Sequence, residues 1–217
     1  MKPKLYCFGE SGNAYKVALT LQLSEVDWDP VFVDFFHGES RSDAFRQLNP
    51  MGEIPVYVVG DKVLTQSGVI LRHIARETGK FGGTNHDEDE EILRWILFDN
   101  HKLSGVAGTH RFNRNFLPKS RKNKDVNSFL SMRLNSALKQ LERHLEQNDW
   151  IALGRPTIAD FSCCGYLFYP EPFDFDCKAL PNIDRWLTRI EALPHWKHPY
   201  DLMPGNPSDR SPGGQND

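Results

Sequence analysis

Three short polar stretches near the start of the chain contain residues that could bind a small thiol-containing peptide. They are Ser11-Gly12-Asn13, Ile54-Pro55 and Gln66-Ser67. The first and the third precede apolar helical patterns, and a helix N-terminus offers free N–H groups and a partial positive charge to a carboxylate or a thiolate. A cis peptide bond before Pro55 would expose the Ile54 N–H and C=O to a ligand, whereas an ordinary strand-initiating proline would not. The three stretches predict a site for a short peptide with carboxylates at its ends and a thiol in its middle.

Each stretch has a distinct part in such a site. Gln66 and the hydroxyl and N–H of Ser67 would hold a terminal carboxylate, and the Ile54 backbone would pair with the peptide as an added strand. The thiol would then lie near Ser11 and Asn13. A free thiol has a pKa of about 8.5, and lowering it by two units requires about 2.7 kcal/mol, which is within the range of two charge-assisted hydrogen bonds. Helix capping is the alternative role of Ser11.

The elements that must position these residues form a small α/β unit. We expect strands at residues 4–8, 31–35, 56–59 and 62–65, and helices starting near Asn13, at 43–48 and at 66–79. The second strand is apolar enough to be buried in a parallel sheet. Gly60-Asp61 suits a type II′ turn between the last two strands. The order βαβαββα is that of a complete α/β unit.

Beyond residue 80 the apolar pattern is helical. We expect an α/β domain at 1–80, a linker at 81–90, an all-α domain at 91–204 and a disordered tail at 205–217. Within the second domain the pattern predicts helices over 88–102, 126–147, 158–168 and 182–193.

Two local features of the helical domain carry further expectations. Thr157 and Asp160 form a capping box at the start of a buried helix. The basic stretch 111–125, which contains Arg111 and Arg114, is typical of a solvated connection, with an anion-binding patch as the alternative.

The composition excludes several classes of protein. A formal net charge of −3 over 217 residues argues against a nucleic-acid binder, and no apolar run approaches the roughly 18 residues of a membrane span. The N-terminus lacks a signal-peptide pattern, so a cytoplasmic location is expected. The four cysteines show neither C-x-x-C nor zinc spacing, so we expect no metal and reduced thiols, with Cys163 and Cys164 in the core.

The ordered set of motifs resembles a cytosolic glutathione S-transferase of the bacterial type with a serine or asparagine turn. The resemblance covers residues 4 to about 203 and rests on four stretches: residues 11–17, 49–56, Gln66-Ser67 and 155–160. It implies a thioredoxin-like N-terminal domain that binds glutathione as co-substrate, an all-helical C-terminal domain for the electrophile, a homodimer and a role in detoxification.

The resemblance also implies roles for individual residues. Pro55 would be the cis-proline, Ile54 the backbone clamp, and Gln66 and Ser67 the ligands of the γ-glutamyl group. Either Ser11 or Asn13 would activate the thiol, and the residues do not separate these two alternatives. A cysteine-type mechanism is disfavoured because the turn contains no cysteine.

Two positions depart from the family pattern. Glu53 stands where relatives often have lysine or glutamine, and its charge would repel the glycyl carboxylate, so that Lys16 or His37 would hold that group instead. Gln66 replaces a frequent glutamate, which removes a charged partner of the γ-glutamyl ammonium unless the other subunit supplies one.

Several aromatic residues and histidines could line the electrophile site but are more often core residues at this spacing. They are His101, His110, Phe112, Phe116, Tyr166 and Tyr169. Tyr6 lies in the first strand, near the tyrosine that other classes of the resembled family use, but a core or interface role is expected for it.

The predicted function is transfer of the glutathione thiolate to a hydrophobic electrophile. One alternative is a glutathione-dependent disulfide or peroxide reductase on the same fold, since an activated thiolate serves both reactions. A second is a non-catalytic glutathione-binding module, which the unusual Glu53 and Gln66 would favour.

Overall fold

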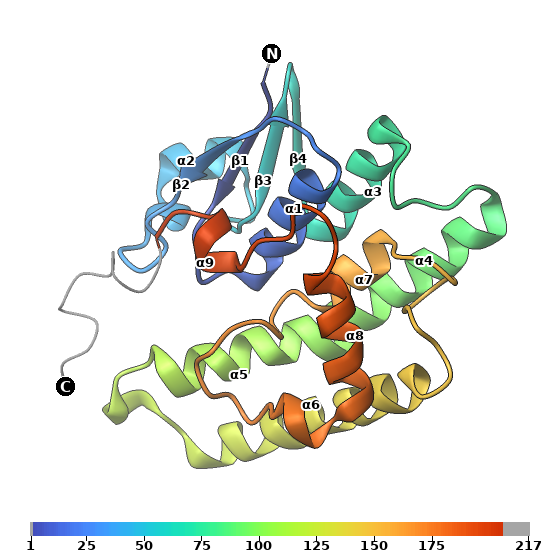
Figure 1. Cartoon of the computed structure of the whole chain (residues 1–217). Coiled ribbons are helices and arrows are strands. Elements are labelled where there is room, and N and C mark those ends of the chain that lie inside the picture. The colour runs from blue at the N-terminus through green and yellow to red at the C-terminus, as the bar shows by residue number, and fades with distance from the viewer. Residues whose placement is uncertain (1, 206–217) are drawn as a thin grey trace.

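A four-stranded sheet with strand order β2-β1-β3-β4 forms the centre of the N-terminal unit (Figure 1). The computed structural model describes residues 2–205. The strands are β1 (Lys4–Cys7), β2 (Asp29–Phe32), β3 (Val56–Val59) and β4 (Lys62–Thr65). β1 pairs in parallel with β2 and antiparallel with β3, and β3 pairs antiparallel with β4. The predicted βαβ unit followed by a hairpin is confirmed.

The second strand differs from the prediction in position and burial. It begins at Asp29 and lies at the edge of the sheet, where Phe32 is 47% exposed. Pro30 is consistent with an edge, because proline cannot donate to the strand ladder. The predicted apolar run extends past the strand, where Val33 packs with Phe45 in a small buried cluster.

The three predicted helices of this α/β unit are present. They are α1 (Gly12–Leu23), α2 (Asp43–Leu48) and α3 (Ser67–Thr78), and a short 3-10 helix at Glu39–Arg41 precedes α2. Ser11 caps α1, since its Oγ accepts from Ala14 N at 3.2 Å. Gly79 ends α3 with a φ of +67°, as expected of a left-handed C-cap.

The helical unit contains α4 (His86–Phe98), α5 (Gly105–Asn115), α6 (Lys124–Leu145), α7 (Ile158–Cys163) and α8 (Pro181–Glu191). A π-helical segment at Asp99–Ser104 joins α4 to α5, and 3-10 helices lie at Lys119–Arg121 and Cys177–Ala179. The last helix, α9 (Pro199–Leu202), returns to the α/β unit and packs against α1 (Figure 1).

Several predicted boundaries and environments in this unit were wrong. The helix predicted to end at residue 102 continues through the π-helical segment to Asn115. Arg111, predicted in a solvated connection, is 2% exposed in α5, because it pairs with the buried Glu10 carboxylate and with Glu171, both distant along the chain. His101 is exposed rather than core, whereas His110 is buried as expected. α4 begins at His86, inside the stretch expected as a linker.

The capping box at the start of α7 is confirmed. Asp160 Oδ2 accepts from Thr157 N at 2.8 Å, and Thr157 Oγ1 accepts from Ala159 N. Asp160 Oδ1 also accepts from Ile151 N and Trp186 Nε1. Burial raises the pKa of Asp160 to about 6, although these donors act to lower it. α7 ends at Cys163 and not near residue 168, because the chain turns where Gly165 meets the α1 backbone.

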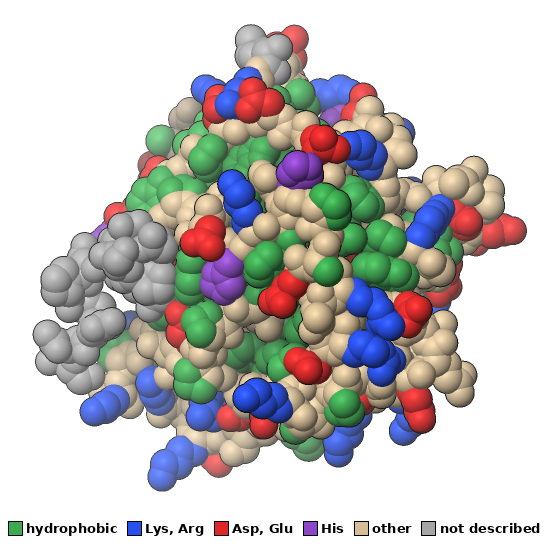
Figure 2. Space-filling view, viewed as in Figure 1, with side chains coloured by type: hydrophobic (Ala, Val, Ile, Leu, Met, Phe, Trp, Pro, Cys, Tyr) green, Lys and Arg blue, Asp and Glu red, His purple; other side chains and the backbone are tan. Residues whose placement is uncertain are grey.

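The distribution of charged side chains and the burial of Cys163 and Cys164 match the expectations from the composition. Acidic and basic side chains are mixed over the face shown in Figure 2. No helix within residues 2–205 is long and apolar enough to cross a membrane. All four cysteines have free thiols, and Cys163 and Cys164 are buried in the core as predicted. The predicted disordered tail lies, from residue 206 onward, outside the described residues.

A buried ion pair joins the α/β unit to the helical unit. Lys16 Nζ on α1 lies 2.5 Å from Asp99 Oδ2 in the π-helical segment, and both side chains are fully buried. Ser104 Oγ and Ser162 Oγ each donate to Asp99 at 2.6 Å. Both oxygens of this carboxylate therefore have partners. Removing one partner would leave a buried charge unsatisfied, so the network stabilises the fold only when all its members are present.

We expect Lys16→Met to lower the free energy of unfolding by about 3–5 kcal/mol, because it leaves the buried Asp99 carboxylate without its cation. Urea unfolding followed by circular dichroism measures the change.

Lys80→Met is the matched control, since Lys80 makes an exposed ion pair with Glu25 that should contribute at most about 1 kcal/mol. Equal effects of the two substitutions would contradict a special role for the buried pair.

Candidate active site

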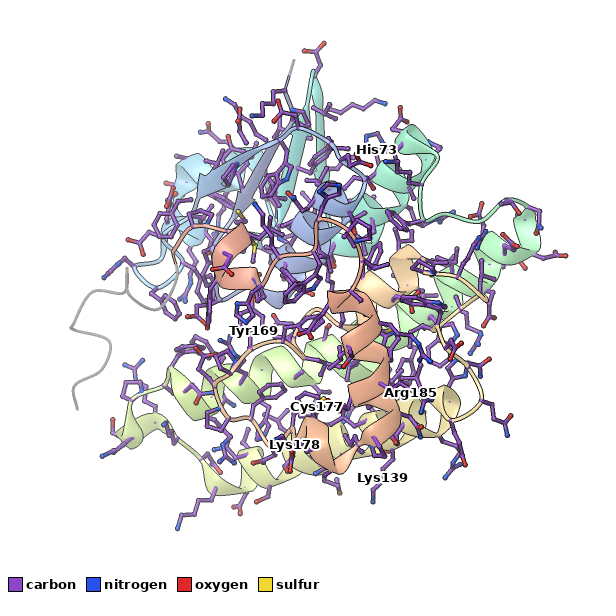
Figure 3. All side chains as sticks on the ribbon, viewed as in Figure 1. His73, Lys139, Tyr169, Cys177, Lys178 and Arg185 are labelled. Carbon is purple, nitrogen blue, oxygen red and sulfur yellow. The ribbon has the colours of Figure 1, made fainter. Side chains whose placement is uncertain are left out.

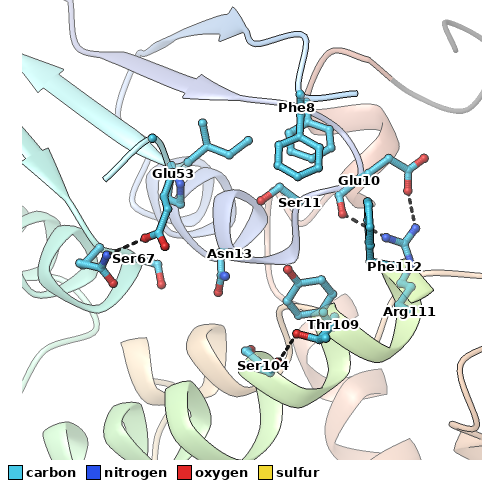
Figure 4. Close-up of a pocket in the computed structure, with 18 of the residues that line it drawn as sticks. Phe8, Glu10, Ser11, Asn13, Glu53, Ser67, Ser104, Thr109, Arg111 and Phe112 are labelled. Carbon is cyan, nitrogen blue, oxygen red and sulfur yellow. Dashed lines mark hydrogen bonds and ion pairs between the residues drawn. The ribbon is translucent and has the colours of Figure 1, made fainter. Parts of the chain in front are cut away.

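A cavity of about 580 Å³ lies between the α/β unit and α5. Seven of the nine residues predicted for the site line it. They are Ser11, Asn13, Glu53, Ile54, Pro55, Gln66 and Ser67. Figure 4 shows Ser11, Asn13, Glu53 and Ser67 on one side of this space, with Ser104, Thr109 and Phe112 of the helical unit opposite.

The first part of the site is the turn between β1 and α1. Ser11 is 6% exposed and its Oγ caps α1. An oxygen that accepts from Ala14 N can still donate its own proton, so capping and contact with a ligand are compatible. Asn13 lies in the first turn of α1, and its side chain points into the cavity (Figure 4).

The second part is the chain that leads into β3. The Ile54–Pro55 peptide bond is cis, as predicted. Asn49, which is 1% exposed, holds the preceding turn through its side chain. Its Nδ2 donates to Glu53 O at 2.7 Å, and its Oδ1 accepts from Met51 N at 3.1 Å. The turn and the cis bond together present the backbone of Ile54 to the cavity.

The third part is the start of α3. Gln66 has a φ of +66°, a region that residues other than glycine rarely adopt, and such outliers cluster at functional sites. Its Nε2 donates to Glu53 Oε2 at 3.1 Å. The side chains of Glu53 and Gln66 are therefore in direct contact.

Two predicted residues do not reach the cavity. Lys16 is fully buried in its pair with Asp99, so it cannot contact a carboxylate of a ligand. His37 is exposed and its Nδ1 lies 2.7 Å from Asp34 Oδ2; it is not among the residues that line the cavity. The expectation that Lys16 could hold the glycyl carboxylate is wrong, because its ammonium is buried against Asp99. The sequence does not show which lysine on a helix is buried.

Phenylalanines from both units form an aromatic wall. Phe8 and Phe35 stack with their ring centroids 4.9 Å apart, and Phe36 lies 5.3 Å from Phe116. Phe112 completes the wall through an edge contact with Phe35. All five side chains line the cavity.

The sequence indicates only part of this aromatic wall. Phe112 and Phe116 are among the aromatic residues that it offers for the cavity, whereas Phe8, Phe35 and Phe36 are not. The adjacent pair Phe35-Phe36 after a strand was the available signal.

Tyr166 also lines the cavity, whereas Tyr169 is 5% exposed and belongs to the core. The ring of Tyr166 lies so close to Gly12 and Gly108 that a Cβ on either glycine would approach it within 2.8 Å. Burial raises the pKa of the Tyr166 hydroxyl, and the Arg111 charge and the N–H groups of Asn13 and Gly12 lower it in part. Tyr6 instead packs edge-on against Phe45.

Glu10 and Arg111 were not predicted for the site, yet both line the cavity. Their charged groups are paired with each other (Figure 4). A lone basic stretch in the sequence cannot indicate such a pair, since its partner is distant along the chain.

Comparisons with known proteins agree with this arrangement. The family model for the glutathione S-transferase N-terminal domain matches residues 1–76, and the model for the C-terminal domain matches residues 112–194. Glutathione S-transferase D6 of Drosophila melanogaster is 26% identical over 197 residues, which cover 88% of this chain and 89% of that protein. Disulfide-bond oxidoreductase YfcG of Escherichia coli is 26% identical over 198 residues, which cover 86% of this chain and 89% of that protein.

A solved structure extends the similarity over nearly the whole chain. It comes from Rhodopseudomonas palustris and is described as a possible glutathione S-transferase. The two chains are 30% identical with a TM-score of 0.82, and the match covers 98% of this chain and 100% of the other. Because both domain models match in chain order and the fold agrees throughout, the chain belongs to the glutathione S-transferase family of enzymes.

Proposed function

We propose that this protein transfers the glutathione thiolate to a hydrophobic electrophile, in the cytoplasm. The observation that carries the proposal is that one cavity joins the Ser11 turn, the Ile54 edge and the start of α3 to an aromatic wall. Glutathione would lie across the first three features, and the electrophile would lie against the phenylalanines.

The proposed roles follow from the chemistry of each group. Ser67 and the N–H groups at the start of α3 bind the γ-glutamyl carboxylate. The Ile54 backbone pairs with the cysteinyl residue as an added strand. The Ser11 hydroxyl or the Asn13 amide donates to the thiolate, and a hydrogen bond to the charged form lowers the pKa of the thiol.

The electrophile is proposed to be aromatic and uncharged. Five phenylalanines form its wall, and aromatic pairs favour stacked and edge contacts. The cavity also contains the carboxylates of Glu10 and Glu53 with one arginine, Arg111, which already pairs with Glu10. A negatively charged electrophile would therefore be repelled.

The thiol pKa of bound glutathione tests the proposal directly. We expect a wild-type value about two units below 8.5, measured as thiolate absorbance against pH in the complex. Ser11→Ala or Asn13→Ala should raise it, because a donor to the thiolate is lost. Conjugation would then fall at neutral pH and recover at high pH, where the thiol ionises unaided.

The variant with the larger rise in pKa identifies the activating group. A wild-type pKa equal to that of free glutathione would contradict an activated thiolate. An unchanged pKa in both variants would exclude both side chains from the role.

The contact between Glu53 and Gln66 suggests a different role for Glu53 from the one first expected. We propose that its carboxylate attracts the γ-glutamyl ammonium and so replaces the charge that Gln66 lacks. The 3.1 Å hydrogen bond between the two side chains supports this, because it places the carboxylate beside the start of α3.

We expect Glu53→Gln to weaken glutathione binding roughly fivefold, since an exposed ion pair contributes up to about 1 kcal/mol. Isothermal titration calorimetry measures the affinity. The matched ligand is a glutathione analogue without the amino group. The variant should bind this analogue as tightly as the wild type does. Tighter binding of glutathione to the variant would instead indicate that Glu53 repels the glycyl carboxylate.

A glutathione-dependent disulfide reductase is the second candidate. The similarity to disulfide-bond oxidoreductase YfcG favours it, and an asparagine in the active-site turn could stabilise a thiolate for either reaction. Parallel assays with an aromatic electrophile and with a small disulfide would separate the two activities.

A homodimer is proposed as the working assembly. A groove of about 710 Å³ runs between α3 and α4. It is lined in part by Val69 and Leu97, which are 53% and 58% exposed. Large exposed apolar side chains beside a groove are typical of an interface.

We expect Val69→Asp combined with Leu97→Asp to convert the dimer to a monomer, because the substitutions would bury charges at the interface. A sizing column with light scattering measures the mass. Phe129→Asp is the control, since Phe129 on α6 is 52% exposed and does not line this groove. A monomeric wild type would contradict the proposed assembly.

A further inference from the structure

Arg111 links α5 to the turn that carries Ser11. Its side chain is 2% exposed. Nη1 donates to the Glu10 carbonyl oxygen at 3.0 Å, and Nη2 pairs with the Glu10 carboxylate (Figure 4). One guanidinium therefore binds both the backbone and the side chain of the residue directly before Ser11.

Two tyrosines from the C-terminal quarter of the chain, Tyr169 and Tyr200, contact the same turn. The Tyr169 hydroxyl donates to the Gly9 carbonyl oxygen at 2.6 Å. The Tyr200 hydroxyl lies 2.9 Å from Glu10 Oε2 and accepts from Arg111 Nη2 at 3.0 Å. Tyr169 lies between the α/β unit and the helical layer (Figure 3).

Further contacts hold Arg111 itself in place. Its guanidinium carbon lies 4.1 Å from the centroid of the Tyr169 ring, a cation–π distance. Nη2 also lies 2.5 Å from Glu171 Oε2. Because the guanidinium is planar and its donors have fixed directions, these partners define one orientation of the side chain.

The contacts end on the main chain of the Ser11 turn, which distinguishes them from ordinary core packing. The bonds from Arg111 and Tyr169 reach the carbonyl oxygens of residues 10 and 9. Those peptide groups determine where the Ser11 hydroxyl and the first N–H groups of α1 point. The local bonds of Ser11, from its N to Phe8 O and from Ala14 N to its Oγ, lie within the turn and do not set its position relative to the rest of the cavity.

The charges of Glu10 and Arg111 also affect the pKa of a thiol near Ser11. Glu10 lines the cavity beside Ser11, and an unneutralised carboxylate there would raise the pKa of a nearby thiol. The Arg111 guanidinium, which Glu10 shares with Glu171, offsets part of that charge.

We infer that Arg111, Glu10, Tyr169 and Tyr200 form a positioning network that holds the Ser11 turn in the geometry that stabilises the thiolate. The inference rests on the proposed function, because the thiolate is that of bound glutathione. The residues of the network act through the turn. Activation of the thiol by the α/β unit thereby depends on the helical unit and on the segment around α9.

Tyr169→Phe and Arg111→Lys test the inference. Tyr169→Phe removes only the oxygen that binds Gly9 O, and Arg111→Lys keeps the charge but loses the fork of donors. Both should raise the thiol pKa of bound glutathione by about half a unit to one unit. Conjugation at pH 6.5 should then fall roughly two- to sixfold and return to the wild-type rate at high pH, with little change in the KM for glutathione.

Arg114→Lys is the matched control, since Arg114 lies on the same helix and pairs with Asp174 at the surface. It should leave the pH profile unchanged. Thermal unfolding of each variant shows whether it folds. If Arg111→Lys fails to fold, the isosteric Tyr169→Phe decides the question alone.

Two outcomes are distinguishable failures. The first is a variant that loses thermal stability although the thiol pKa of its bound glutathione stays as low as in the wild type. This outcome would overturn the inference and leave the proposed function intact. A wild-type thiol pKa equal to that of free glutathione would overturn the proposed function, and the inference with it.

Discussion

The ion pair between Lys16 and Asp99 is the interaction on which the relation between the two units depends. Both charges are fully buried, and an isolated buried charge would be strongly unfavourable. Asp99 also accepts from Ser104 and Ser162. The carboxylate therefore binds α1, the π-helical segment and α7 at a single point, which places the start of α1 against the helical unit.

The π-helical segment determines where α5 begins. Such segments often occur at functional sites because they change the direction of the side chains that follow. Here Gly105 lies where a Cβ would come within 2.8 Å of Asn100 O, and Gly108 lies against the Tyr166 ring. Small residues on this face of α5 leave room for the cavity, and Arg111 and Phe112 lie one turn further along the helix.

The cavity combines two kinds of wall. The α/β unit supplies helix N-termini and a backbone edge, which suit carboxylates and a peptide, and the aromatic wall supplies apolar surface. Its charges lie in two separate contacts, Glu53 with Gln66 and Glu10 with Arg111. The first contact is at the end of the cavity near α3, and the second is beside the Ser11 turn. In the proposed reaction, binding of glutathione and activation of its thiol thus involve different groups.

The sequence by itself determined the order of the elements, the hairpin, the capping box at Thr157 and seven of the residues that line the cavity. These features are local, because helical periodicity, caps and turns depend on residues within a few positions of one another. Only the tertiary structure decided the roles of Lys16 and Arg111, whose partners Asp99 and Glu10 lie 83 and 101 residues away. A basic side chain looks the same in a sequence whether it is solvated or buried, since its environment depends on which carboxylate the fold brings to it. The same reason explains why the aromatic wall, formed from two units, was recognised only in part.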